Sequence, residues 1–400
     1  MAIRRPIGSL KKTLRGTLLA AVCLTIAASA AAERLPASVA APAELAPGLN
    51  HLLEMAGSQA KPEFDPELIG PLMAFITADK SGGTFFSAPR KTGGPSAYYQ
   101  VLIRRSLKSI IAYAFSPDIP ALATVPSSTR MVRWMSDEDG QTALPRLGRM
   151  LENLSAPVLV HGRETVVNTP DQFSGAYYDY EQDRALILYP YQQRTALISI
   201  SRQNGRSGPG RKGVVLGRDS DWDYLYSREI GLNLKGLGWM RSHMFDSYGI
   251  NVYLETAKGG PETILAAFKW VRAGWNSINV VRDGHVYSGL QRFGTTFKRI
   301  IESPLLPEPA ELASALSPIK SLSHSRLRAR MDIYRRLLAR RHADVLTSAS
   351  GWPASVLNDP QYWDSLSEEE MQSVLVVEKM KQALTNETTD LSARLLQFNP

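Results

Sequence analysis

The segment GRDSDWDYLYS places three aspartates at alternate positions, directly after a glycine-rich basic loop. Asp219, Asp221 and Asp223 have the carboxylate spacing with which a calcium-binding loop begins. Such a loop also needs glycine at its sixth position and glutamate at its twelfth, where this chain has Tyr224 and Ile230. Two interpretations therefore remain open: a divalent-cation site completed by ligands from elsewhere, or a solvated polar turn.

The preceding loop, RQNGRSGPGRKG at 202–213, contains four glycines and four basic residues. Glycine lets backbone amides approach an anion, and basic side chains such as those of Arg211 and Lys212 attract phosphate or carboxylate. These two residues are therefore candidate ligand contacts. The loop lacks the GxxxxGK[ST] order of a nucleotide-binding loop. The alternative is a flexible connection whose cations pair with the aspartates that follow.

Aromatic residues are dense between Trp222 and Trp275, where they alternate with Arg and Lys. Trp222, Trp239 and Trp270 are candidate ligand contacts, because amphipathic rings suit sugars, lipid headgroups or a protein partner. The alternative is that these rings fill the core of an aromatic-rich sheet.

Motifs for catalysis are absent or incomplete. The chain has no GxSxG motif for a nucleophilic serine and no HExxH motif for zinc. His243 and Asp246 stand three residues apart and could serve as an acid/base or ligand pair. The paired carboxylates of a glycoside hydrolase cannot be chosen from 38 acids by sequence alone. Catalytic residues therefore remain unassigned.

Residues 1–32 have the pattern of a secretory signal peptide. MAIRRPIGSLKKTLRG carries five basic residues and no acid, and an apolar run with small residues at Ala28, Ser29 and Ala30 follows. We expect cleavage near Ala30 or Ala32. An uncleaved membrane anchor is the alternative, although the run is shorter than the roughly 20 residues of a bilayer span. The protein is thus predicted to be exported, to the periplasm or out of the cell.

Export changes how the charge and the cysteine content are understood. Removing residues 1–32 takes away five of 46 basic residues and none of 38 acids, which lowers the formal net charge from +8 to +3. Most of the basicity thus belongs to the export signal, so nucleic-acid binding is not indicated. Cys23, the only cysteine, is removed too, which excludes disulfides and thiol chemistry. A secreted chain of this size without disulfides is typical of a bacterial periplasm or envelope.

Residues 176–203 predict an antiparallel meander, because runs rich in Tyr, Ile, Leu and Val alternate with the polar clusters EQDR and YQQR. We expect three strands here, with turns at both polar clusters. Further strands are predicted at 98–103, 129–134 and 248–255. Together with the helices between them, they indicate an α+β fold whose body, at 65–305, is built on an antiparallel meander sheet.

One helix between the strands has a clear signature. Ser106 can cap a helix whose Leu107, Ile110, Ile111 and Ala114 share one face. We expect this face to pack against the sheet.

The chain changes character outside the body. Residues 306–400 show helical periodicity only, and Ser367 with Glu370 has the capping-box spacing of a helix start. Residues 33–64 are rich in Ala and Pro and are interpreted as a leader or linker with one short helix near 49–55. The helical C-terminal region either packs against the body or forms a separate domain.

The segment at 325–346 combines an apolar stripe with a face dense in arginine. A basic amphipathic helix can lie on an anionic membrane surface. Arg335, Arg336, Arg340 and Arg341 are therefore candidate contacts to such a surface or to an acidic partner. The alternative is that the stripe docks onto the protein, with the arginines facing solvent or the acidic residues at 368–370.

These observations predict an exported envelope protein that binds a lipid, a glycan or another envelope protein without transforming it. The alternative is a hydrolase acting on an envelope polymer. A divalent cation at the three aspartates is the one cofactor that the sequence suggests.

Overall fold

The computed structural model describes residues 39–57, 62–78, 86–88, 94–135, 144–172, 174–231, 241–344, 352–385 and 389–397. The predicted signal peptide and Trp239 lie outside these described residues. Residues 38–400 group into one compact unit, so the body and the C-terminal helices belong together.

Two sheets form the framework of this unit, which has the α+β architecture that the sequence predicts. The larger sheet contains ten strands of the described chain, in the order β1 (Val39–Ala40), β2 (Phe86–Ser87), β3 (Ser96–Ile103), β12 (Thr263–Trp275), β11 (His243–Glu255), β8 (Arg194–Gln203), β7 (Asp179–Tyr191), β5 (Val158–Asn168) and β4 (Thr129–Trp134), with β13 (Ile278–Asn279) beside β12. The smaller sheet has the order β10 (Tyr224–Ile230), β9 (Arg211–Val215) and β6 (Ala176–Tyr177).

Strands β4 to β12 of the larger sheet follow one another as an antiparallel meander, and β3 then pairs with β12. The predicted strands at 98–103 and 129–134 are confirmed as β3 and β4, while β11 begins five residues before the predicted 248. The prediction of a turn at EQDR is wrong, because β7 runs through these residues and pairs with β5 and β8 on either side. The YQQR turn is confirmed as the β7–β8 connection.

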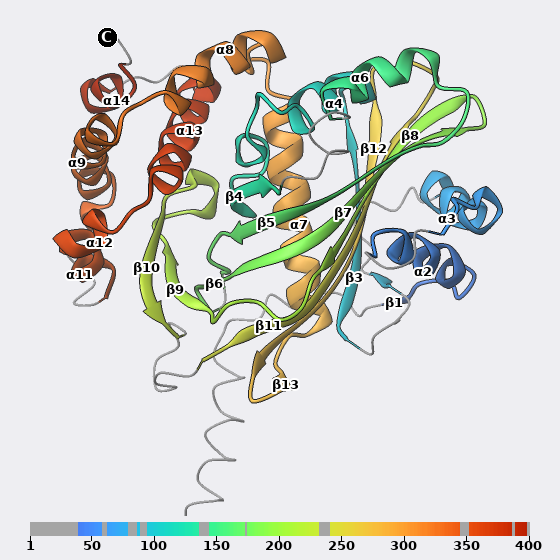
Figure 1. Ribbon diagram of the computed structural model, residues 1–400, viewed down its shortest axis with the longest axis horizontal. Coiled ribbons are helices and arrows are strands. Elements are labelled where there is room, and N and C mark those ends of the chain that lie inside the picture. Colours follow the sequence, from blue (N-terminus) through green and yellow to red (C-terminus); the bar gives the residue numbers. More distant parts are fainter. Residues whose placement is uncertain are drawn as a thin grey trace, which may run out of the picture. The chain divides into compact units, whose positions relative to one another are not determined.

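Helices cover both faces of the larger sheet (Figure 1). The helices of the described chain are α2 (Leu45–Met55), α3 (Pro66–Ala78), α4 (Leu107–Ala114), α6 (Leu147–Met150), α7 (Asp283–Ile301), α8 (Pro309–Lys320), α9 (His324–Arg341), α11 (Trp352–Asn358), α12 (Pro360–Asp364), α13 (Glu368–Thr385) and α14 (Asp390–Leu395), with short 3-10 turns at η1 (Ala121–Ala123), η2 (Leu144–Arg146), η3 (Leu151–Asn153) and η4 (Asp219–Asp221). Helices α2 and α3 lie on one face, whereas α7 lies on the other, between that face and the smaller sheet.

Alternation along the strands divides the core into two clusters. Odd-numbered β7 residues such as Ala185 and Ile187 are buried on the face toward α2 and α3, whereas Leu186 and Leu188 are buried on the opposite face. Helix α2 lies within the segment interpreted as a leader or linker, yet its Leu52 has no exposed surface. This helix is thus part of the core.

Local capping signals of the sequence are confirmed. The Ser109 amide donates to Ser106 Oγ at 3.2 Å, and α4 begins at the next residue, Leu107. At the start of α13, the Glu370 amide donates to Ser367 Oγ and the Ser367 amide donates to Glu370 Oε2. Both helices therefore begin where their side chains satisfy free backbone donors.

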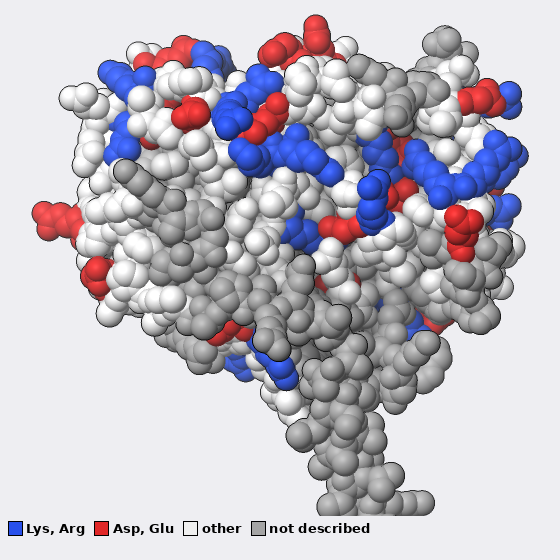
Figure 2. All heavy atoms as spheres, turned by 180° about the vertical axis from the view of Figure 1, so that it is seen from behind, with Lys and Arg blue, Asp and Glu red and all other residues white. Residues whose placement is uncertain are grey.

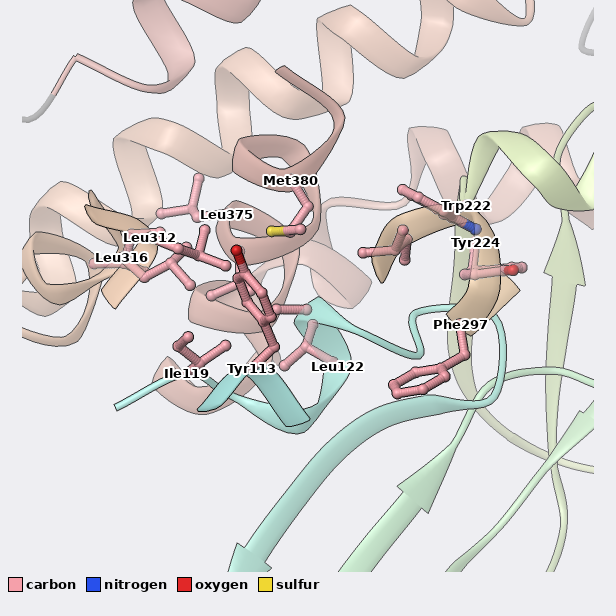
Figure 3. Close-up of a cluster of buried hydrophobic side chains, with 14 of the residues drawn as sticks. Tyr113, Ile119, Leu122, Trp222, Tyr224, Phe297, Leu312, Leu316, Leu375 and Met380 are labelled. Atoms are coloured by element: carbon pink, nitrogen blue, oxygen red, sulfur yellow. The ribbon is translucent and has the colours of Figure 1, made fainter. Parts of the chain in front are cut away.

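The C-terminal helices dock onto the body through their apolar faces. Figure 3 shows Leu312 and Leu316 of α8 and Leu375 and Met380 of α13 in one cluster with Tyr113 of α4. The apolar stripe of α9 is buried too, and it comprises Leu327, Met331, Tyr334, Leu337 and Leu338. Docking of this stripe, the alternative to membrane contact, is therefore what the fold adopts. Among the described residues, no helix has the length and apolar character needed to span a bilayer.

A buried network of charges joins the smaller sheet to α9 and α13. Asp223 Oδ2 lies 2.9 Å from His342 Nε2, and Asp223 also contacts Lys381 and Arg341. Arg341 and Lys381 in turn contact Glu378, at 2.9 and 2.7 Å. Burial alone would raise the pKa of Asp223, but Lys381, His342 and Arg341 lower it to about 2. The ionised carboxylate therefore stabilises the docked C-terminal region.

Asp223→Asn should destabilise the protein by about 3 kcal/mol at pH 5, because it leaves buried cations without their carboxylate. The folded pKa lies below the unfolded value of about 3.9, so this stabilisation is present above that value and is lost as pH falls toward 2. The difference in Tm between wild type and variant should thus shrink from pH 5 to pH 2.5. Asp221→Asn, at a partly exposed carboxylate whose partners all lie within its own turn, is the matched control. A constant difference across this range would contradict the assignment.

Candidate polar binding patch on the larger sheet

Six directly paired positions cross the middle of the larger sheet on one face. The row is Gly162 (β5), Arg184 (β7), Ser201 (β8), Gly249 (β11), Lys269 (β12) and Ala97 (β3). Directly paired residues project their side chains to the same face of an antiparallel sheet. Arg184 and Lys269 are the two charged members, and only Ser201 and Gly249 stand between them. Two long cationic side chains therefore extend over a floor of small residues.

The rows on either side are also polar. Ser199 and Asn251 are paired in one adjacent row, and Glu164 and Gln182 are paired in the other. We call the following residues the polar patch: Glu164, Gln182, Arg184, Ser199, Ser201, Asn251 and Lys269. One row beyond Ser199 and Asn251, paired Leu197 and Tyr253 are buried and apolar. The patch is thus bounded by the core on this side.

Lys269 is the charged residue of the polar patch that has no oppositely charged partner in the described chain. Its side chain is only partly exposed, and no carboxylate of the described chain lies within ion-pair distance of it. Burial lowers the pKa of Lys269, and the neighbouring charge of Arg184 lowers it further, to about 8. An ammonium group in such surroundings gains from a bound anion.

Gly249 allows Lys269 to lie across the row. A Cβ atom at this glycine would stand 3.6 Å from Lys269 Nζ and 2.9 Å from Ser201 Oγ. The Lys269 side chain therefore extends over the backbone of β11 toward Ser201 and Arg184. A larger residue at position 249 would displace both groups, so this arrangement of Lys269 and Ser201 requires glycine at this position.

Arg184 is fixed in place by neighbouring strands. Its Nε and Nη2 donate to Glu164 Oε2 at 3.1 and 2.8 Å, and its Nη1 donates to Ser199 Oγ at 3.0 Å. Gln182 Nε2 donates to the same Glu164 oxygen at 2.8 Å. Glu164 neutralises Arg184, so the charge of Lys269 is left in excess.

Two elements frame the polar patch. On the β3 side, Tyr99 packs against α7, where a Cβ at Gly294 would stand 2.5 Å from the tyrosine ring. On the β4 side, the ring of Trp134 covers Gly162 so closely that a Cβ there would stand 2.0 Å from it. The patch thus lies on the α7 face of the sheet, between this helix and the indole ring of Trp134.

The three aspartates singled out by the sequence do not face a common point. Asp219 accepts from Arg292 Nε at 2.8 Å and from Nη2 at 2.5 Å, Asp221 pairs with Arg218, and Asp223 belongs to the buried network. Within the described ranges, no three His, Cys, Asp or Glu side chains are grouped so that they could hold a metal ion. Asp219 and Asp221 lie in the 3-10 turn η4, whereas Asp223 follows the turn and is buried rather than solvated; each of the three carboxylates faces a basic partner.

The other predicted ligand contacts are distributed over the fold. Arg211 pairs with Asp179 at 3.4 Å, and Lys212 pairs with Glu229 at 2.8 Å. Trp270 has only 1% of its surface exposed and packs in the core toward α2 and α3. Its ring therefore fills the sheet core rather than a surface site.

The arginines of α9 divide into two groups. Arg341 belongs to the buried network, whereas Arg336 and Arg340 are exposed and Arg335 is partly exposed. Because the apolar stripe is buried, α9 cannot insert that stripe into lipid while it is docked. On the face drawn in Figure 2, Lys and Arg side chains lie in separate groups with acids among them.

Sequence reasoning missed the polar patch, although a signal was present. EQDR, here interpreted as a turn, supplies Gln182 and Arg184 in mid-strand. Lys269 interrupts the run TILAAFKWV in the same way. Polar residues within a long strand pattern are thus the sequence signal of this site.

The chain matches no protein-family model, no curated protein and no solved structure.

The Lys269 amine should titrate near pH 8, well below a free lysine, in an NMR titration of isotopically labelled lysine side chains. Arg184→Gln should raise this pKa, because it removes a neighbouring positive charge and leaves Glu164 without its cation. Lys258→Met, a change in an exposed turn, is the control that assigns the resonance of a surface lysine. A Lys269 pKa near 10.5 in the wild type would contradict the assigned surroundings.

Proposed function

We propose that this protein is an exported envelope protein that binds a carboxylate- or phosphate-bearing ligand on the polar patch without transforming it. The observation that carries the proposal is Lys269, a partly exposed cation without a carboxylate partner in the described chain. Export rests on the signal-peptide pattern of residues 1–32.

The chemistry of the polar patch suits recognition of an anion beside neutral polar groups. Lys269 supplies a compact charge, while Ser201 and Asn251 supply groups that can donate to ligand oxygens. Glu164 holds Arg184 by two hydrogen bonds, which keeps the guanidinium fixed before a ligand arrives. Acidic glycans and anionic lipid headgroups share this anionic chemistry.

Binding should depend on the protonation of Lys269. We expect isothermal titration calorimetry with glucuronate and with dihexanoyl phosphatidate, tested separately, to show binding of one of them at pH 7. The affinity should fall at pH 9, because the amine loses its proton above pH 8. The probe that binds distinguishes the glycan source of the anion from the lipid source.

Lys269→Met should weaken this binding at least tenfold, about 1.4 kcal/mol, whereas Lys258→Met should leave it unchanged. Gly249→Val should weaken it too, since its side chain occupies the space between Ser201 and Lys269. If neither probe binds at millimolar concentration, or if Lys269→Met binds as tightly as the wild type, the proposal fails.

A hydrolase is the second candidate, and one observation favours it. Ser201 Oγ and Lys269 Nζ both lie beside Gly249, and an unprotonated lysine can act as the base for a serine nucleophile. A fluorophosphonate probe should then label Ser201, and Ser201→Ala should remove the label while Ser199→Ala keeps it. Absence of labelling in the wild type would leave binding alone as the proposed function.

A further inference from the structure

A small cavity lies where the smaller sheet meets the C-terminal helices. Its volume is about 30 Å³, and its wall includes Arg130 of β4, Trp222 and Tyr226 of the smaller-sheet hairpin, Tyr334 of α9 and Val377 of α13. Figure 3 shows Trp222 and Tyr224 on the side of the core cluster opposite Leu312 and Leu316. The cavity therefore belongs to the docking interface of the C-terminal region.

Two buried donors at this cavity lack partners. Arg130 Nε and Trp222 Nε1 are two of four buried side-chain atoms in the described chain without a hydrogen bond. Leaving such a donor unsatisfied costs about 1–3 kcal/mol. Both residues line the same cavity, so an acceptor placed there is a candidate partner for both donors.

The charges around the cavity are not balanced. Glu370 is the only acid that Arg130 contacts among the described residues, at 3.0 Å, and it also contacts Arg228 at 2.7 Å. Burial would raise the pKa of Glu370, but Arg130 and Arg228 lower it, so the carboxylate stays ionised. Two guanidinium groups thus share one carboxylate, although the Arg228 side chain is 45% exposed and solvent screens part of its charge.

From these observations we infer that the cavity binds a single halide-sized anion, such as chloride, between Arg130 and Trp222. The volume of about 30 Å³ exceeds the roughly 10–15 Å³ that one water-sized occupant needs, so a single monatomic anion fits. Arg130 Nε and Trp222 Nε1 can only donate, so the occupant must accept from both. The hydroxyl-bearing rings of Tyr226 and Tyr334 complete the wall.

Anion binding here would strengthen docking of the C-terminal helices. Arg130 lies on β4 and Tyr334 on α9, so an occupant contacts both the body and the C-terminal region. The site differs from the polar patch, and its function is independent of the ligand proposed there. The protein would thus be stabilised by halide whether or not the patch is occupied.

Thermal unfolding in sodium chloride or bromide, compared with sodium gluconate at equal ionic strength, tests this site. We expect halide to raise the Tm of the full chain by about 3 °C. Trp222→Phe keeps the ring but removes the donor, and it should lose most of this rise. Trp275→Phe, at a partly exposed position on β12, should keep it.

Crystals of the wild type soaked in bromide provide a measurement that does not depend on variants. We expect an anomalous peak between Arg130 Nε and Trp222 Nε1. Water alone in the cavity, with no anomalous peak, would overturn the inference, as would a Tm that is equal in halide and gluconate.

Discussion

The continuous register of the antiparallel meander is the constraint on which the rest of the structure depends. Direct pairing from β5 through β12 to β3 aligns residues that are distant in the sequence into single rows. Because side chains alternate along each strand, a shift of one residue in any pair would exchange its apolar and polar sets. The same register therefore determines the two core clusters and the polar patch on the α7 face of the sheet.

Buried charge is compensated across long sequence distances in this fold. Asp223 and His342 are separated by 119 residues and meet at 2.9 Å, and Arg130 and Glu370 are separated by 240 residues. Removing one partner from such a pair costs several kcal/mol, so these contacts hold the C-terminal helices against the body. Lys269 departs from this pattern, since no carboxylate of the described chain pairs with it.

The two sites proposed here differ in the kind of occupant that their surroundings allow. Lys269 is partly exposed and lies beside Gly249 and Ser201, whereas four other residues of the polar patch are buried, namely Glu164, Gln182, Ser199 and Ser201. The cavity at Arg130 and Trp222 is small, about 30 Å³, and aromatic rings form much of its wall. The two proposed roles therefore belong to different places in the fold.

The sequence by itself determined the features that depend on near neighbours in the chain. Apolar alternation predicted β3 and β4, and the caps at Ser106 and Ser367 predicted where two helices begin, since each signal lies within a few residues. The tertiary structure alone decided what the polar residues do. EQDR resembles a turn locally, but pairing with β5 and β8 makes it part of a strand, and there Arg184 meets Glu164. The three alternate aspartates suggest one site, yet only Asp221 pairs locally, with Arg218. Asp219 and Asp223 face cations from distant segments, because a charged side chain takes the partner that folding places beside it.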